Sequence, residues 1–164
     1  MLATNLTICG DFDLSIDLKF PNRSMSKLTK LFSLQVTNGT RNTNGLTVGS
    51  SILTVSVQPS QSDVTLMITY MIDKNQTFKC NVTKKLKADN WINLKISQKT
   101  GVYEIKLDYH LVYNRTNPSP KRWPNVELRT GNNYGMENTS AIVNYRNLEF
   151  NRICSETSKI MKYS

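Results

Sequence analysis

The clearest pattern in the chain is a strict alternation of apolar and polar residues over positions 91–108. From Ile92 to Ile96, and again from Tyr103 to Leu107, apolar residues occupy every second position. A period of two places the apolar side chains on one face of a strand and the polar ones on the other. Lys99-Thr100-Gly101 separates the two runs, and Gly101 can adopt a positive φ without steric cost. The stretch is therefore predicted to form a β-hairpin with one buried face.

Similar short runs follow one another along the rest of the chain, separated by polar, glycine or proline residues roughly every 8–12 positions. The further predicted strands are residues 12–18, 31–37, 46–48, 52–57, 64–72, 77–82, 126–128 and 141–150. Residues 109–113 either continue the second strand of the hairpin or begin the next one, and residues 114–124 are predicted to be a loop. No amphipathic helix is indicated. The pattern predicts an all-β, antiparallel two-sheet sandwich as a single domain over residues 9–154, with residues 1–8 and 155–164 as terminal extensions.

The formal net charge of this 164-residue chain is +9, which favours acidic partners such as sulfated glycans or anionic surfaces. The basic residues are spread over many predicted outward positions, so a solvated surface is the favoured interpretation. We therefore expect no nucleic-acid partner. A membrane association is expected only through segments flanking this chain, because no run of about 18 apolar residues occurs.

Asn-x-Ser/Thr sequons are frequent, and several fall where loops are expected. They begin at Asn5, Asn22, Asn38, Asn75, Asn81, Asn114 and Asn138. Glycosylation at sequons requires passage through the secretory route, so the chain is predicted to be secreted or to be an ectodomain of a membrane protein. The alternative is an asparagine-rich cytosolic chain. No secretion signal is visible at the first residues.

The three cysteines, Cys9, Cys80 and Cys154, do not have the spacing of a metal site. Cys9 and Cys154 flank the patterned region, and the termini of compact domains often lie close together. We predict a Cys9–Cys154 disulfide, the favoured one of three pairings. In the chain-entropy description it contributes about 4–5 kcal/mol to the free energy of unfolding. Cys80 is then a buried thiol or a link to a segment outside this chain.

The order of these features resembles the concanavalin A-like, laminin-G-like jelly roll. The resemblance covers Asp11 to Phe150 and depends on the strand over residues 12–18, the Trp-x-x-Leu-x-Ile strand at 91–96, its partner at 103–108, and the closing strand over 141–148. It implies a non-enzymatic extracellular recognition or adhesion module that binds a protein partner or a cell-surface glycan. Some such domains bind calcium at the rim. Here Asp108 has no obvious carboxylate neighbour, so we expect no cofactor.

Catalytic chemistry is weakly indicated. His110 is the only histidine, and a structural role at a strand end is favoured over a nucleophilic triad. Asp11, Asp13 and Asp17 share the outward face of one predicted strand, but no paired-carboxylate motif of a glycosidase is present. These carboxylates are interpreted as a solvated strand face. The chain is therefore predicted not to be an enzyme.

The candidate binding residues lie in predicted loops at the rim of the sandwich. Trp123, framed by prolines and preceded by Lys121 and Arg122, either stacks on a ligand or packs over the end of the sandwich. Tyr134 is a second aromatic candidate, and Lys84 and Lys85 begin the densest basic run. The predicted function is protein recognition through these loops. The alternative is a lectin that binds glycans, including sulfated ones.

Overall fold

The computed structural model describes residues 3–8, 10–20, 29–37, 50–59, 64–73, 76–84, 90–130, 143–153 and 160–163. All regular secondary structure in these ranges is β-strand, arranged in two six-stranded sheets. Backbone contacts divide the chain into two units that largely follow the two sheets. No helix in the described ranges is long and apolar enough to cross a membrane.

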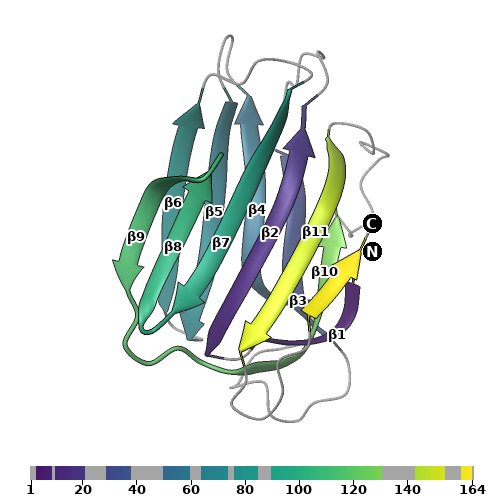
Figure 1. Cartoon of the computed structure of the whole chain (residues 1–164). Coiled ribbons are helices and arrows are strands. Elements are labelled where there is room, and N and C mark those ends of the chain that lie inside the picture. The colour runs from purple at the N-terminus through teal and green to yellow at the C-terminus, as the bar shows by residue number, and fades with distance from the viewer. Residues whose placement is uncertain are drawn as a thin grey trace. The chain divides into compact units, whose positions relative to one another are not determined.

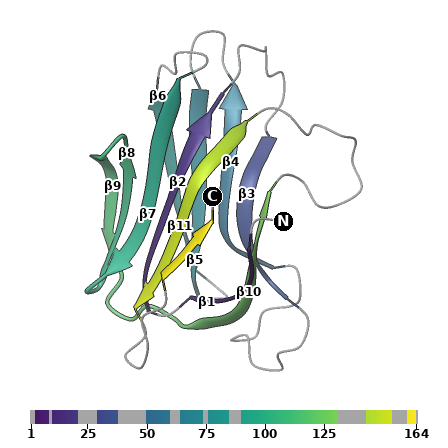
Figure 2. The same cartoon turned by 45° about the vertical axis from the view of Figure 1, so that its right-hand side comes forward.

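The first sheet has the strand order β1-β10-β3-β4-β5-β6, and its registered strand pairs are antiparallel. Figure 2 shows β10 beside β3. The strands are β1 (Ala3–Ile8), β3 (Thr29–Val36), β4 (Ser51–Pro59), β5 (Val64–Asp73), β6 (Gln76–Lys84) and β10 (Trp123–Thr130).

The second sheet has the strand order β12-β11-β2-β7-β8-β9, and all of its strand pairs are antiparallel (Figure 1). Its strands are β2 (Asp11–Lys19), β7 (Trp91–Lys99), β8 (Val102–Leu107), β9 (His110–Thr116), β11 (Asn144–Ile153) and β12 (Ile160–Tyr163).

The alternation read from the sequence matches the observed burial. On β2, the side chains of Phe12, Leu14, Ile16 and Leu18 are buried, and most of the intervening polar ones are partly exposed. On β7 and β8 the same period is present. The second sheet therefore has a buried apolar face, because a strand with this period can bury only one set of side chains. The exception on β2 is Asp13, which is also buried.

The predicted hairpin is confirmed. Lys99 pairs with Val102, and the two residues between them, Thr100 and Gly101, have φ values of 47° and 78°. Two positive φ angles in a two-residue connection are typical of the turn that suits the twist of antiparallel strands. The turn is anchored further because Asn117 N donates to Gly101 O at 2.7 Å.

Several boundaries differ from the prediction. Residues 109–113 follow the second of the two predicted alternatives and begin the next strand, because Asp108 and Tyr109 form a second turn with positive φ and β9 begins at His110. The predicted loop over 114–124 is instead the end of β9, a short connection, and the start of β10. The predicted terminal extensions contain β1 and β12. The predicted strand over 46–48 lies outside the described residues.

Candidate functional site

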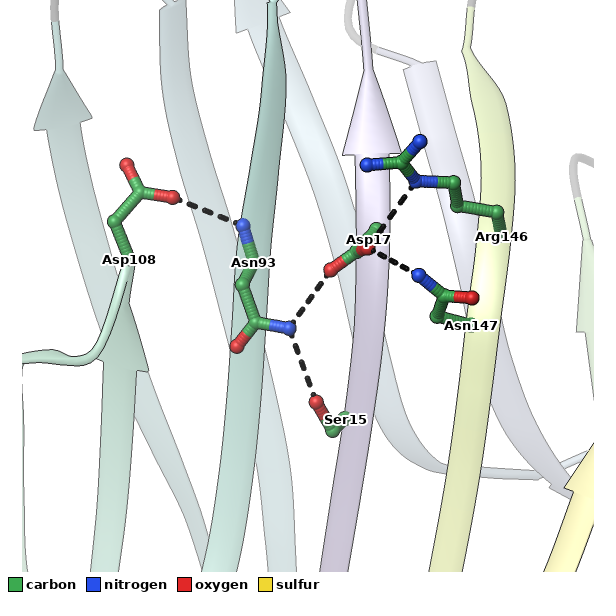
Figure 3. A network of polar contacts seen from close by, with 6 residues as sticks. All are labelled: Ser15, Asp17, Asn93, Asp108, Arg146 and Asn147. Atoms are coloured by element: carbon green, nitrogen blue, oxygen red, sulfur yellow. Dashed lines mark hydrogen bonds and ion pairs between the residues drawn. The ribbon is translucent and has the colours of Figure 1, made fainter.

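A row of polar side chains crosses the second sheet from β11 to the turn after β8 (Figure 3). It consists of Arg146, Asp17, Asn93 and Asp108, which we call the Asp17 row. Arg146 pairs with Asp17 in the β11–β2 register, and Asp17 pairs with Asn93 in the β2–β7 register. Residues directly opposite in antiparallel strands project from the same face of a sheet, so these side chains meet.

Asp17 is the centre of the row. Its Oδ1 accepts a hydrogen bond from Asn93 Nδ2 at 2.8 Å, and its Oδ2 accepts from Asn147 Nδ2 at 2.8 Å and from Arg146 Nε at 3.3 Å. Burial by itself raises the pKa of Asp17. The three donors and the charge of Arg146 outweigh that effect, so the pKa lies below its ordinary value. Asp17 is therefore ionised at neutral pH and fixes three donor side chains.

Asn93 and Asp108 tie the far end of the row to the backbone. Asn93 N donates to Asp108 Oδ1 at 2.9 Å, and Asp108 N donates to Asn93 O at 2.8 Å. Asn93 Nδ2 also donates to Ser15 Oγ at 3.1 Å. Because both the side chain and the backbone of Asp108 bond to β7, the chain is held there while Tyr109 turns into β9.

Arg146 combines a fixed position with exposure. Its guanidinium carbon lies 4.0 Å from the centre of the Trp91 ring, and its Nε is bonded to Asp17. Lys19 Nζ lies 5.9 Å from the same ring centre. Within the described part of the chain, the terminal nitrogens of Arg146 have no hydrogen-bond partner, and the side chain is 49% exposed. A guanidinium held in this way presents a fork of N–H donors that matches a carboxylate.

Elsewhere on this face the charges pair with one another. Asp13 forms ion pairs with Lys95 at 3.2 Å and with Lys99 at 2.8 Å, and Glu104 pairs with Lys106 at 3.2 Å. The prediction of simply solvated carboxylates on β2 was therefore wrong for both Asp13 and Asp17. The end of the face around Trp91 differs, because Lys19 and Arg146 both lie beside that ring and Asp17 forms an ion pair with Arg146.

The structure does not gather the predicted binding residues into one site. Trp123 begins β10 and has no exposed surface, so its ring packs inside and is not presented for stacking. Burial raises the pKa of Tyr70 to about 12. Lys121 and Arg122 are exposed. Lys84 ends β6, and Lys85 and Tyr134 lie outside the described residues.

The predicted modification and disulfide residues are only partly described. Asn81 on β6 and Asn114 on β9 have exposed side chains, and Asn5 lies in β1. The other predicted glycosylation residues, Asn22, Asn38, Asn75 and Asn138, lie outside the described residues, as do Cys9 and Cys154. Cys80 is a buried free thiol, and burial raises its pKa.

Comparisons with known proteins place this geometry in a fold class. No protein-family model matches the chain, and no curated protein matches its sequence. An alginate lyase from Pseudomonas aeruginosa is similar in structure, with a TM-score of 0.61 and 7% identity over 87% of this chain. The marine PL7 alginate lyase AlyA1 from Zobellia galactanivorans has a TM-score of 0.57 and 14% identity over 94% of this chain.

A third similar structure is a heptameric pentraxin from Limulus polyphemus, with a TM-score of 0.54 and 8% identity over 91% of this chain. This chain spans 65% of the length of each lyase and 66% of the pentraxin. The comparisons confirm the predicted fold class, an all-β jelly-roll sandwich of the concanavalin A-like type.

The same comparisons correct two predictions made from the sequence. The chain was expected to be a non-enzymatic adhesion module or a lectin, whereas alginate lyases recur among the proteins that share its fold. The error arose because the sequence was examined only for the motifs of hydrolytic enzymes. A carboxylate pair, a triad or a zinc motif indicates hydrolysis, but a lyase breaks its bond by elimination and needs none of these.

Proposed function

We propose that this chain is an enzyme that cleaves an acidic, uronate-containing polysaccharide by β-elimination on the exposed face of β11, β2 and β7. The observation that carries the proposal is Arg146. Its guanidinium is stacked on Trp91 and oriented by Asp17, and its terminal nitrogens are not used by described residues. A bidentate guanidinium–carboxylate pair is a strong and geometrically specific contact, so Arg146 suits the carboxylate that every uronate carries.

Two further features support a polysaccharide substrate. Trp91 offers an apolar ring beside the cations, which suits the apolar face of a sugar next to its carboxylate. The alginate lyases that share the fold act on a polyuronate, and the net charge of +9 favours the approach of a polyanion.

Elimination from a uronate has simple requirements. A base removes the proton at C5, the C4–C5 double bond forms, and the C4–O glycosidic bond breaks as the leaving oxygen gains a proton. Pairing the uronate carboxylate with Arg146 stabilises the negative charge that develops when the C5 proton leaves. No water is consumed, so the products differ from those of hydrolysis.

Histidine is the side chain most often used for proton transfer, so the place of His110 decides whether it can take this role. It is the only histidine in the chain, and it is exposed at the start of β9. Four strand spacings separate β11 from β9, or about 19 Å, and His110 pairs with Leu107 of the buried face, so His110 does not act on the uronate that Arg146 holds. The base that takes the C5 proton of that uronate is therefore a group other than His110.

In the test, the protein is incubated with alginate, polygalacturonate, hyaluronan or chondroitin, and the formation of unsaturated uronate is followed by its ultraviolet absorbance. We expect turnover on at least one polymer. Arg146→Gln should lower kcat/KM by at least about tenfold, the loss expected for one charged hydrogen-bonded contact. Lys79→Gln, which removes one exposed charge from the first sheet, is the matched control and should leave the rate unchanged. Equal rates for the two variants would refute the role of Arg146, and no turnover on any polymer would refute the function.

Three expectations from the sequence stay predictions: export of the chain, the Cys9–Cys154 disulfide and the laminin-G-like subdivision of the fold. Peptide mapping of protein from a secreting host under non-reducing conditions tests the first two. A linked Cys9–Cys154 peptide is expected, and free thiols at both positions would contradict the pairing.

A further inference from the structure

Besides the Asn5 sequon on β1, two sequons of the described residues fall on edge strands. Asn81-Val82-Thr83 lies on β6, the last strand of the first sheet, and Asn114-Arg115-Thr116 lies on β9, the last strand of the second. Both asparagine side chains are exposed. Asn114 was predicted to lie in a loop, and this prediction was wrong, because the residue lies in β9. Edge strands expose a row of unpaired backbone groups, which can pair with the edge of another molecule.

The two edges differ in the side chains that accompany the sequon. Among the described residues, the exposed large apolar side chains all belong to the β8–β9 hairpin: Tyr109 at 81%, Leu111 at 49%, Val112 at 39% and Val102 at 37% exposure. On β6, in contrast, the exposed positions carry Gln76, Thr77, Lys79 and Thr83. An exposed apolar edge strand favours association between copies, whereas a lysine on the edge opposes it.

We propose that Asn114 carries an N-linked glycan that covers the apolar edge of β9 and prevents pairing of this strand between copies of the chain. Asn114 is two residues beyond Val112 in the same strand, so a glycan there occupies the space that a second β9 would need. In the modification, Asn114 Nδ2 forms a bond to C1 of a lipid-diphosphate-linked oligosaccharide. The C1–O bond to the diphosphate breaks, and Nδ2 loses a proton. This inference is independent of the proposed enzymatic function.

The experiment uses the full chain secreted from a eukaryotic host. Glycopeptide mapping should find Asn114 occupied in most molecules, and an unmodified Asn114 peptide would overturn the proposal. Asn114→Gln should raise the weight-average molar mass, measured by light scattering after size exclusion, by about twofold, as edge-to-edge pairing of two copies requires. Asn81→Gln is the matched control, since it removes a sequon from the polar edge, and it should leave the mass unchanged apart from the lost glycan.

A triple variant tests the cause. Adding Leu111→Thr and Val112→Thr to Asn114→Gln keeps residues suited to strands but removes the apolar surface, so the protein should return to a monomer. Thr116→Ala removes the sequon while leaving Asn114 in place, and it should behave like Asn114→Gln. If the variants are not secreted, endoglycosidase trimming of the folded wild-type protein supplies the same measurement. A monomeric Asn114→Gln or trimmed protein at high concentration would overturn the shielding role.

Discussion

Replacing Asp17 with asparagine keeps the size of the side chain but removes its charge and one of its two acceptor oxygens. The remaining oxygen can face Arg146 and Asn147, or it can face Asn93, but not both sides at once. The orientation that keeps two donors bonded places an amide group against Asn93 Nδ2, so that hydrogen bond is lost. The substitution therefore separates the role of the carboxylate charge from the packing of β2.

The magnitude follows from the contacts. A hydrogen bond to a charged group contributes about 1.5–3 kcal/mol, and a neutral one about 1 kcal/mol. Asn93 keeps its second partner, Ser15, which limits the cost of the lost bond, and the bond from Arg146 is long at 3.3 Å. We expect Asp17→Asn to lower the free energy of unfolding by about 2–3 kcal/mol.

The assay is urea unfolding at neutral and at acidic pH, with Asp11→Asn as the control for a lost charge on the same strand. Among the described residues, Asp11 accepts only a long, exposed hydrogen bond from Thr100 N at 3.4 Å, so its variant should lie within about 0.5 kcal/mol of the wild type. The folded pKa of Asp17 is lowered, so its stabilisation is present above the unfolded carboxyl pKa of about 4 and is lost as the pH falls through the folded value. The difference between Asp17→Asn and the wild type should therefore shrink below about pH 4. Equal stability of the two variants at neutral pH, or an undiminished difference in acid, would refute the role given to Asp17.

Three further measurements test other parts of the structure. Gly101→Ala should lower the free energy of unfolding in urea by about 1 kcal/mol, because φ at this position is +78°. The added Cβ meets Asn117 O at an ordinary 3.7 Å. An unchanged unfolding midpoint would contradict the strained turn. Burial raises the pKa of Tyr145 and Tyr70 to about 12, so the free energy of unfolding should fall between about pH 10 and 12. The fall should be less steep in Tyr145→Phe, and parallel pH profiles of this variant and the wild type would contradict the raised pKa of Tyr145. Burial also raises the pKa of Cys80, so a thiol reagent should label it only after unfolding, and immediate labelling of the folded protein would contradict its burial.

The sequence predicted the fold well where the burial pattern is local. The alternation on β2, β7 and β8 depends only on residues two positions apart, and the turn at Gly101 depends on a residue type that tolerates positive φ. The second turn was left open because Tyr109, which also has a positive φ, is not a typical turn residue. Asp108 is held there by Asn93, which is 15 positions earlier in the chain. A contact at that separation leaves no local signal.

The candidate site depends on strand register, which the sequence does not reveal. Asp17 meets Asn93 across 76 positions and Asn147 across 130, so the Asp17 row exists only once β2 lies between β7 and β11. The available signal was that Asp17 and Asn93 both occupy outward positions of predicted strands. Trp123 shows the opposite case, because the sequence favoured packing over the end of the sandwich from a loop, with stacking on a ligand as the alternative, and the structure buries it at the start of β10.

Mass spectrometry of the products from an acidic polysaccharide tests the central claim most directly. Elimination predicts that each cut yields one unsaturated chain end and that the two fragments together have the mass of the starting chain, with no water added. An intact polymer after prolonged incubation, or fragments whose combined mass has increased by one water per cut, would contradict the proposed function.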